Sequence, residues 1–211
     1  MRKYFFILPF VILLIAGCSP KLFRDLDMRP ATSVKMQRNS LMPVFDHLEG
    51  AKFYSTQIDF KENSMAGILA VTKESDGHFR MVLMTAFGMT LFDFSLSRDS
   101  FIVNSCVEQM NKKMVLNLLE KDFRSLFMLN VPNEFKAVYY RNKEKQNWIG
   151  YSVKADDGEC NYLIYPRENN FVRNIQNGCF IKRMQAVFDE QVITIYHPKL
   201  KLKLVMTEMN M

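Results

Sequence analysis

Side chains that could perform acid–base, nucleophilic or metal chemistry are few and scattered in this sequence. The three histidines are His47, His78 and His197, and no two of them have the spacing of a metal site. The chain contains no Gly-x-Ser-x-Gly, His-Glu-x-x-His or Cys-x-x-Cys motif and no glycine-rich phosphate loop. An enzyme that acts on lipid or glycan would need an acidic and a basic side chain that converge on the substrate, and the sequence indicates no such pair. We therefore expect a protein that is not an enzyme and that binds neither a metal nor a cofactor.

One cysteine stands where covalent modification is expected. The chain starts with basic residues, and an apolar run of about 13 residues, 4–16, follows, as in a secretory signal. A transmembrane helix needs ~20 apolar residues, so a membrane-spanning anchor is the weaker interpretation. The run ends Leu-Ile-Ala-Gly-Cys, and this ending resembles the lipobox of bacterial lipoproteins. The resemblance implies that residues 1–17 are a signal peptide and that Cys18 becomes the lipidated N-terminus.

Charge and cysteine content exclude two further classes of protein. Removal of residues 1–17 leaves 194 of the 211 residues and two fewer positive charges, so the formal net charge falls from +6 to +4. This weak charge gives no single-sign face for nucleic acid, and we expect no nucleic-acid partner. With Cys18 modified, three cysteines remain, too few for a full disulfide framework. Cys160 and Cys179 could pair or could be buried free thiols.

The remaining sequence predicts one mainly β domain, 32–211, of the α+β class. Residues 18–31 have no sustained period and prolines near both ends, which favours a lipidated tether. Residues 32–49 have a rough helical spacing and predict an N-terminal helix. From Ala51 onward apolar and polar residues alternate, which predicts a strand. Similar runs predict further strands at 65–73, 78–86, 89–97, 100–107, 135–141, 147–155, 159–166, 180–188, 191–197 and 199–207.

A helix interrupts these strands. It begins at Asn111, is stopped by Pro132, and carries its apolar residues on one stripe. The predicted fold is therefore a single curled antiparallel sheet of about ten or eleven strands, an open half-barrel, with the inserted helix covering its concave face.

The chain is rich in flexible and aromatic apolar residues, with 15 Met and 18 Phe. A cavity lined by such residues suits flexible acyl chains, but the same residues could simply fill a dry core, and composition leaves both possibilities open. The candidate walls of an acyl groove are Met81, Leu83, Leu91, Phe92, Phe94, Leu119 and Phe123.

Between two predicted strands stands the tripeptide Ala86, Phe87, Gly88, where a polar turn is expected. An aromatic side chain at the tip of a hairpin is usually there to enter another chain or a bilayer. The alternative is that the turn folds back and buries Phe87. The sequence predicts a membrane-contact hairpin under the first alternative and an ordinary core residue under the second.

The order of these parts resembles the LolB family of outer-membrane lipoproteins, which receive lipoproteins from the periplasmic carrier LolA. The resemblance covers roughly 50–130 and rests on residues 79–94, FRMVLMTAFGMTLFDF, which resemble the family's strand, Pro-Leu-Gly hairpin and second strand. It implies an open β-barrel with an apolar concave face covered by helices. It also implies that Phe87 takes the place of the exposed leucine, with Ala86 in place of the proline and Gly88 retained.

The resulting functional expectation is an outer-membrane lipoprotein that faces the periplasm. Its partners would be membrane lipid through Cys18, the acyl chains of a lipoprotein or lipid cargo, and a LolA-like periplasmic carrier. The alternative is a non-catalytic accessory or structural lipoprotein of an envelope complex, with the same fold and a filled core.

Overall fold

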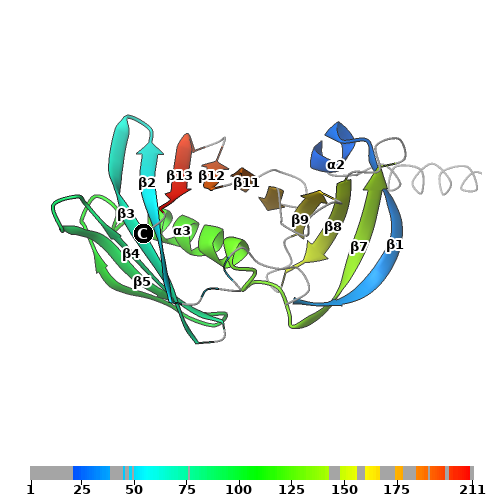
Figure 1. Cartoon of the computed structure of the whole chain (residues 1–211), viewed down its shortest axis with the longest axis horizontal. Helices are drawn as coiled ribbons and strands as arrows, with labels where there is room; N and C mark the ends of the chain where they lie inside the picture. The colour runs from blue at the N-terminus through cyan, green and yellow to red at the C-terminus, as the bar shows by residue number, and fades with distance from the viewer. Residues whose placement is uncertain are drawn as a thin grey trace, which may run out of the picture.

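The computed structural model describes residues 21–38, 45, 48, 50–75, 77–142, 148–155, 160–166, 174–177, 184–189, 191–197 and 200–209. These residues form one antiparallel sheet and two helices (Figure 1). No helix among them has the length and apolar character needed to cross a membrane. Cys179 lies outside the described residues, and both alternatives for Cys160 and Cys179, a disulfide or free thiols, therefore stay as the sequence left them.

The sheet has 13 strands, and each strand is antiparallel to its neighbours. In spatial order they are β1-β7-β8-β9-β10-β11-β12-β13-β2-β3-β4-β5-β6. The elements are α2 (Lys21–Asp25), β1 (Met28–Gln37), β2 (Ala51–Phe60), β3 (Asn63–Ser75), β4 (His78–Met84), β5 (Thr90–Leu96), β6 (Phe101–Cys106), α3 (Lys113–Leu126), β7 (Glu134–Asn142), β8 (Trp148–Lys154), β9 (Cys160–Pro166), β10 (Asn174–Asn177), β11 (Met184–Asp189), β12 (Val192–His197) and β13 (Leu202–Glu208).

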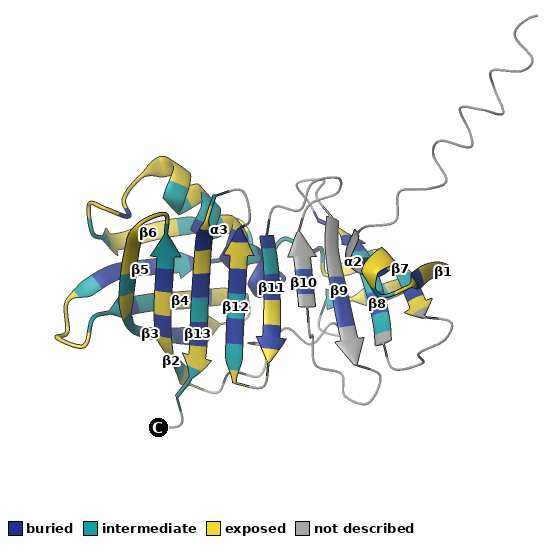
Figure 2. Ribbon diagram, turned by 90° about the horizontal axis from the view of Figure 1, so that it is seen from above, coloured by how far each residue is buried: buried dark blue, intermediate teal, exposed yellow. Residues whose placement is uncertain are grey.

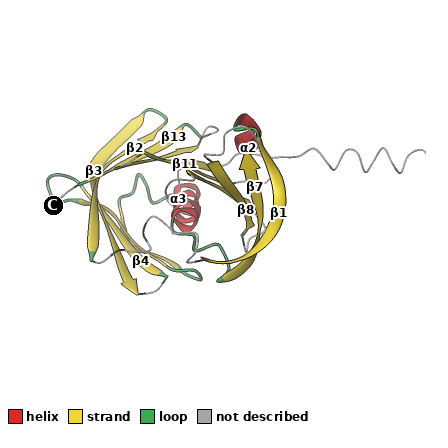
Figure 3. Cartoon of the chain, turned by 45° about the vertical axis from the view of Figure 1, so that its right-hand side comes forward, coloured by secondary structure: helices red, strands yellow, loops and turns green. Residues whose placement is uncertain are grey.

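The sheet curls around α3 without closing, so that β1 and β6 remain its two edges (Figure 3). Strongly twisted open sheets rarely exceed about ten strands without curling. Buried and exposed residues alternate along β12 and β13, as a strand with one covered face requires (Figure 2). The predicted curled antiparallel sheet with a covering helix is confirmed.

The start of the chain was predicted wrongly. The segment interpreted as a tether, 18–31, is folded from Lys21 onward as α2 and the start of β1. The predicted helix at 32–49 is a strand up to Gln37, and most of 39–49 lies outside the described residues. Because β1 is an edge strand, it tolerates Pro30, at which its register with β7 shifts. With β1 and the four-residue β10, the 11 predicted strands become 13.

Helix α2 packs on the outer face of the sheet, at the β1 end. Phe23 is fully buried, and its ring centroid lies 4.1 Å from that of Tyr140 on β7. Gly150 on β8 makes room for it, since a Cβ there would lie 2.8 Å from Phe23 Cε1 and 2.9 Å from Met28 Cε. The first described residues are thus fixed to this end of the sheet.

Helix α3 ends at Leu126, earlier than Pro132, because a C-terminal cap stops it first. Met128 adopts a left-handed conformation, with a φ of 55°. The Met128 N–H donates to the Ser125 carbonyl, and the Leu129 N–H donates to the Arg124 carbonyl. This is the Schellman arrangement, which satisfies the last helical carbonyls. The following apolar turn folds back into the core, where Phe127 stacks on Phe79 of β4 at 4.3 Å between ring centroids.

Gly67 on β3 provides the first testable prediction. A Cβ at this position would lie 2.3 Å from the Met84 backbone oxygen at the end of β4. Since a backbone atom must move, we expect Gly67→Ala to lower the free energy of unfolding by about 1–3 kcal/mol. Urea denaturation measures this change. Glu62→Ala in the adjoining turn should change stability by less than about 0.5 kcal/mol, and equal effects of the two variants would contradict the prediction.

Candidate functional site

The inner face of the sheet is filled in the half that contains β2–β6. All seven predicted groove residues lie there or on α3, and none is more than 6% exposed. Phe92 and Phe94 stack at 4.3 Å between ring centroids, and the same core cluster includes the apolar stripe of α3. Of the two cavities described below, the one beside α3 is bordered by Leu119 and the one along β1 and β7 by none of the seven. These seven residues are Met81, Leu83, Leu91, Phe92, Phe94, Leu119 and Phe123.

Leu119 borders a small apolar cleft between α3 and the ends of β2, β3 and β13. The cleft has a volume of about 40 Å³. That volume suits a few water molecules, whereas ligand pockets usually measure ≈ 300–1,000 Å³. An acyl chain would enter here only if α3 moved. The lining residues are Ile58, Phe60, Met65, Gln109, Met110, Met114, Val115, Leu118, Leu119, Leu200 and Leu202.

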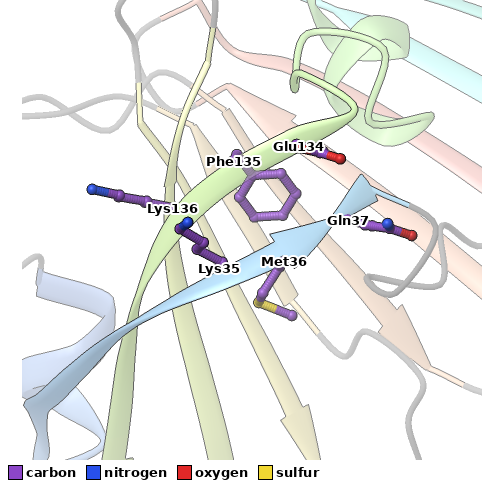
Figure 4. A pocket seen from close by; sticks show the side chains of 6 residues that line it. All are labelled: Lys35, Met36, Gln37, Glu134, Phe135 and Lys136. Atoms are coloured by element: carbon purple, nitrogen blue, oxygen red, sulfur yellow. The ribbon is translucent and has the colours of Figure 1, made fainter.

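A much larger cavity lies at the other end of the sheet, along the β1–β7 pair, with a volume of about 540 Å³ (Figure 4). Met36 and Phe135 are register partners that both pack against the main core. In Figure 4 their side chains lie beside each other, with Lys35 and Lys136 on one side of them. Its lining thus combines the apolar pair of Met36 and Phe135 on the inner face with charged residues at alternate positions of the same strands, whose side chains point to the other face.

The inner face is only partly covered around this cavity. Val34, Tyr139, Ile149 and Tyr151 are half-buried, in contrast to the fully buried Phe94 of the opposite half. The Tyr139 and Tyr151 rings lie 5.8 Å apart between centroids. Of the two cavities, the one with room for a ligand thus lies at the β1 end of the sheet. The sequence contained a signal for it in the apolar–polar alternation of residues 33–37, which was interpreted as helical.

A buried polar pair joins α3 to the sheet. His197 Nε2 on β12 lies 2.7 Å from Asp122 Oδ2, and each side chain is 4% exposed. Two residues later on α3, the Arg124 guanidinium donates to the Ser97 and Arg98 carbonyls in the β5–β6 turn. Arg124 also pairs with Glu120 at 3.0 Å. Polar contacts therefore hold the covering helix both to β12 and to the β5–β6 turn.

Burial raises the pKa of the Asp122 carboxyl, and the hydrogen bond and electrostatic interaction with His197 oppose this rise. Sequence analysis gave His197 no metal or catalytic role, and the structure shows it as one half of this buried pair. Sequence analysis missed Asp122 altogether. The signal was there, because Asp122 lies seven residues after Val115 and three after Leu119, on the apolar stripe of the helix.

The β4–β5 hairpin presents its aromatic residue to solvent. Phe87 is 99% exposed, so the alternative in which the turn buries it is wrong. The Thr85 N–H donates to the Met89 carbonyl, the Gly88 N–H donates to the Thr85 carbonyl, and Gly88 has a φ of 81° that glycine adopts without strain. Neighbouring Ala86 and Met89 are also exposed. The hairpin and α2 lie at opposite ends of the long axis (Figures 1 and 2).

Comparison with known proteins bears on the fold. No family model matches the chain, and no curated protein matches it. Among solved structures, a LolA superfamily protein from Nitrosomonas europaea is 9% identical, with a TM-score of 0.54 over 83% of this chain and 92% of that chain. The fold is of the LolA type. The predicted resemblance is thereby confirmed at the level of fold.

Two further solved structures also match. A DUF1329 family protein from Desulfovibrio piger is 7% identical, with a TM-score of 0.49 over 81% of this chain and 88% of that chain. A putative outer membrane lipoprotein-sorting protein domain from Vibrio parahaemolyticus is 5% identical, with a TM-score of 0.49 over 79% of this chain and 86% of that chain. The described residues of this LolA-type chain contain no cluster of His, Cys, Asp and Glu able to hold a metal ion.

The pair that joins α3 to β12 in this LolA-type fold gives the second prediction. We expect Asp122→Ala and His197→Ala each to lower the free energy of unfolding by about 3–5 kcal/mol, because each leaves a buried polar group without its partner. The decrease in the free energy of unfolding of the double variant should be smaller than the sum of the decreases of the two single variants. A double-mutant cycle by urea denaturation measures this coupling.

Glu120→Ala is the control for this cycle, because it breaks a partly exposed pair on the same helix. Its cost should be about 0.5 kcal/mol. If the decreases in the free energy of unfolding for Asp122→Ala and His197→Ala are additive, the contact between the two side chains does not itself contribute to stability.

Proposed function

We propose that this protein is an outer-membrane lipoprotein that binds acyl chains at the β1 end of its inner face and passes a lipoprotein or lipid to the membrane. The observation that carries the proposal is the 540 Å³ cavity along β1 and β7, whose volume is that of a ligand pocket. Its apolar floor of Met36 and Phe135 belongs to a half-covered face in a LolA-type fold. Cys18 carries the lipid anchor in this proposal, and the domain faces the periplasm.

Transfer of this kind needs no bond chemistry. An acyl chain gains about 0.8 kcal/mol for each buried CH₂, in a protein cavity as in a bilayer. The chain therefore moves toward whichever environment covers more of it. A cavity that is open on one side covers a chain incompletely, and this favours release to a membrane. A LolA-like periplasmic carrier is the proposed donor.

A second function is favoured by one observation, the filled core between α3 and β2–β6. In an accessory or structural lipoprotein of an envelope complex, the domain would act as a rigid scaffold, and the open cavity would bind part of a partner protein. Binding of acyl chains separates the two functions, because only the first requires it.

Acyl binding at the β1–β7 cavity is the third prediction. We expect the chain from Ser19 onward, which contains every described element, to bind a fluorescent fatty acid that unlabelled fatty acids displace. Met36→Gln combined with Phe135→Gln should weaken binding at least about tenfold, because contact with one buried apolar side chain is worth about 1.5–3 kcal/mol. Fluorescence titration measures the dissociation constants.

Val138→Gln is the matched control, since Val138 lies on β7 three residues after Phe135 and is exposed on the opposite face. It should leave the affinity unchanged. Failure of the parent chain to bind any acyl probe would refute the carrier function and favour the accessory one.

The exposed hairpin gives the fourth prediction. Phe87→Ala should leave stability within about 0.5 kcal/mol of the parent, because the side chain has no packing to lose. It should slow transfer of the bound fluorescent fatty acid to vesicles severalfold, because the hairpin would no longer insert an aromatic ring into the bilayer. Stopped-flow fluorescence measures the transfer rate.

Tyr196→Ala removes an exposed aromatic side chain from β12 and should leave the transfer rate unchanged. Equal transfer rates for the parent and Phe87→Ala would show that the hairpin has no part in delivery.

A further inference from the structure

Two arginines face each other across the β1–β7 ladder. Arg29 on β1 and Arg141 on β7 are register partners, and both are exposed. Side chains that lie directly opposite in an antiparallel pair have Cβ atoms about 4.5–5.5 Å apart, and like charges there are destabilising. Among the described residues neither guanidinium has an acidic partner, and this includes Asp25 and Asp27, which are close in sequence. An anion between the two arginines would remove this repulsion.

Both arginines lie on the inner face of the sheet. Arg141 has the same parity along β7 as Ala137, which is fully buried in the main core, and as Tyr139 between them. The register partner of Arg141 on β8 is Ile149, which packs against the same core. The inner face at this end therefore passes from two guanidinium groups to tyrosine rings and then to apolar residues. This order of charged, aromatic and apolar side chains matches the order of the headgroup and interfacial regions of a membrane.

The position of α2 brings this end close to the proposed anchor. Phe23 of α2 packs on the outer face of β7 and β8, the two strands that carry Arg141 and Ile149. Three residue steps separate Cys18 from Lys21, the first residue of α2. An extended chain spans at most ~3.3–3.6 Å per residue, so a lipid on Cys18 lies within about 11 Å of the start of α2.

We propose that Arg29 and Arg141 form a docking surface for anionic phospholipid headgroups of the bilayer that holds the Cys18 anchor. This inference rests on the proposed lipidation of Cys18 and not on acyl binding in the cavity. A juxtamembrane Lys or Arg gains about fivefold in binding to an anionic surface, and this gain falls with salt. The two guanidinium groups, together with the short link to Cys18, fix which end of the domain meets the membrane.

The test uses the full lipidated chain reconstituted into vesicles. Trp148 is the only tryptophan and begins β8, one residue before the register partner of Arg141, so it reports on this end of the sheet. A headgroup spin-labelled lipid serves as the quencher. We expect stronger quenching of Trp148 when phosphatidylglycerol is mixed into phosphatidylcholine vesicles, and loss of this increase at high salt.

Arg29→Gln and Arg141→Gln should each lower the contact equilibrium about fivefold, and together they should reduce quenching to the level in phosphatidylcholine alone. Lys113→Gln with Lys121→Gln removes the same charge from exposed positions on α3 and should leave quenching unchanged. Circular dichroism of each variant confirms that the fold is retained.

Co-flotation with the vesicles separates the two ways in which the proposal can fail. A chain that does not float lacks the Cys18 anchor, which refutes the lipoprotein proposal and this inference with it. A chain that floats with equal quenching in both kinds of vesicle retains the anchor and overturns the role of the arginines.

Discussion

The contact on which the whole molecule depends is the packing of α3 against the inner face of the sheet. Thirteen strands at ≈ 4.8 Å spacing give an inner face about 58 Å wide. A helix of 14 residues is only about 21 Å long. One such helix cannot cover a surface of this width, even when the sheet curls around it. The half that α3 covers becomes a close-packed core, whereas the inner face at the β1 end keeps half-buried side chains, among them Val34, Tyr139 and Tyr151.

Polar contacts add precision to this apolar packing. Hydrophobic contact between a helix stripe and a sheet is tolerant of sliding, because many apolar positions are interchangeable. Asp122 has a partner only where His197 lies, and Arg124 only where the β5–β6 turn presents its carbonyls. These contacts fix the position of α3 along its axis. Burying Asp122 has an energetic cost, as the raised pKa of its carboxyl indicates. If α3 moves, either Asp122 separates from His197 or β12 moves together with the helix.

Much of this fold could be predicted from the sequence, and the parts that could not share physical causes. Apolar and polar residues alternate along a strand that has one covered face. The predicted bounds of β2–β6 and β11–β13 are therefore close to the observed ones. Edge strand β1 was missed because it pairs on one side only and accommodates Pro30. The seven residues expected to form the groove walls are buried in the half that α3 covers, because inner-facing apolar residues look alike in sequence, whether or not a helix covers them. Phe87 was singled out because an aromatic residue in a hairpin turn departs from ordinary turn composition, but the sequence left open whether the side chain is exposed or buried.

The separation of α2 from the β4–β5 hairpin restricts how the domain can sit in an envelope. In the proposed lipoprotein, a lipid on Cys18 would hold the α2 end within about 11 Å of its bilayer, whereas the β4–β5 hairpin, which carries the exposed Phe87, lies at the far end of the long axis. Both can touch one bilayer only if the domain lies lengthwise along it. An upright domain would instead hold its aromatic tip across the periplasmic space, facing an incoming carrier or the opposite membrane. The tilt of the long axis therefore decides whether the hairpin is a point of delivery or a point of reception.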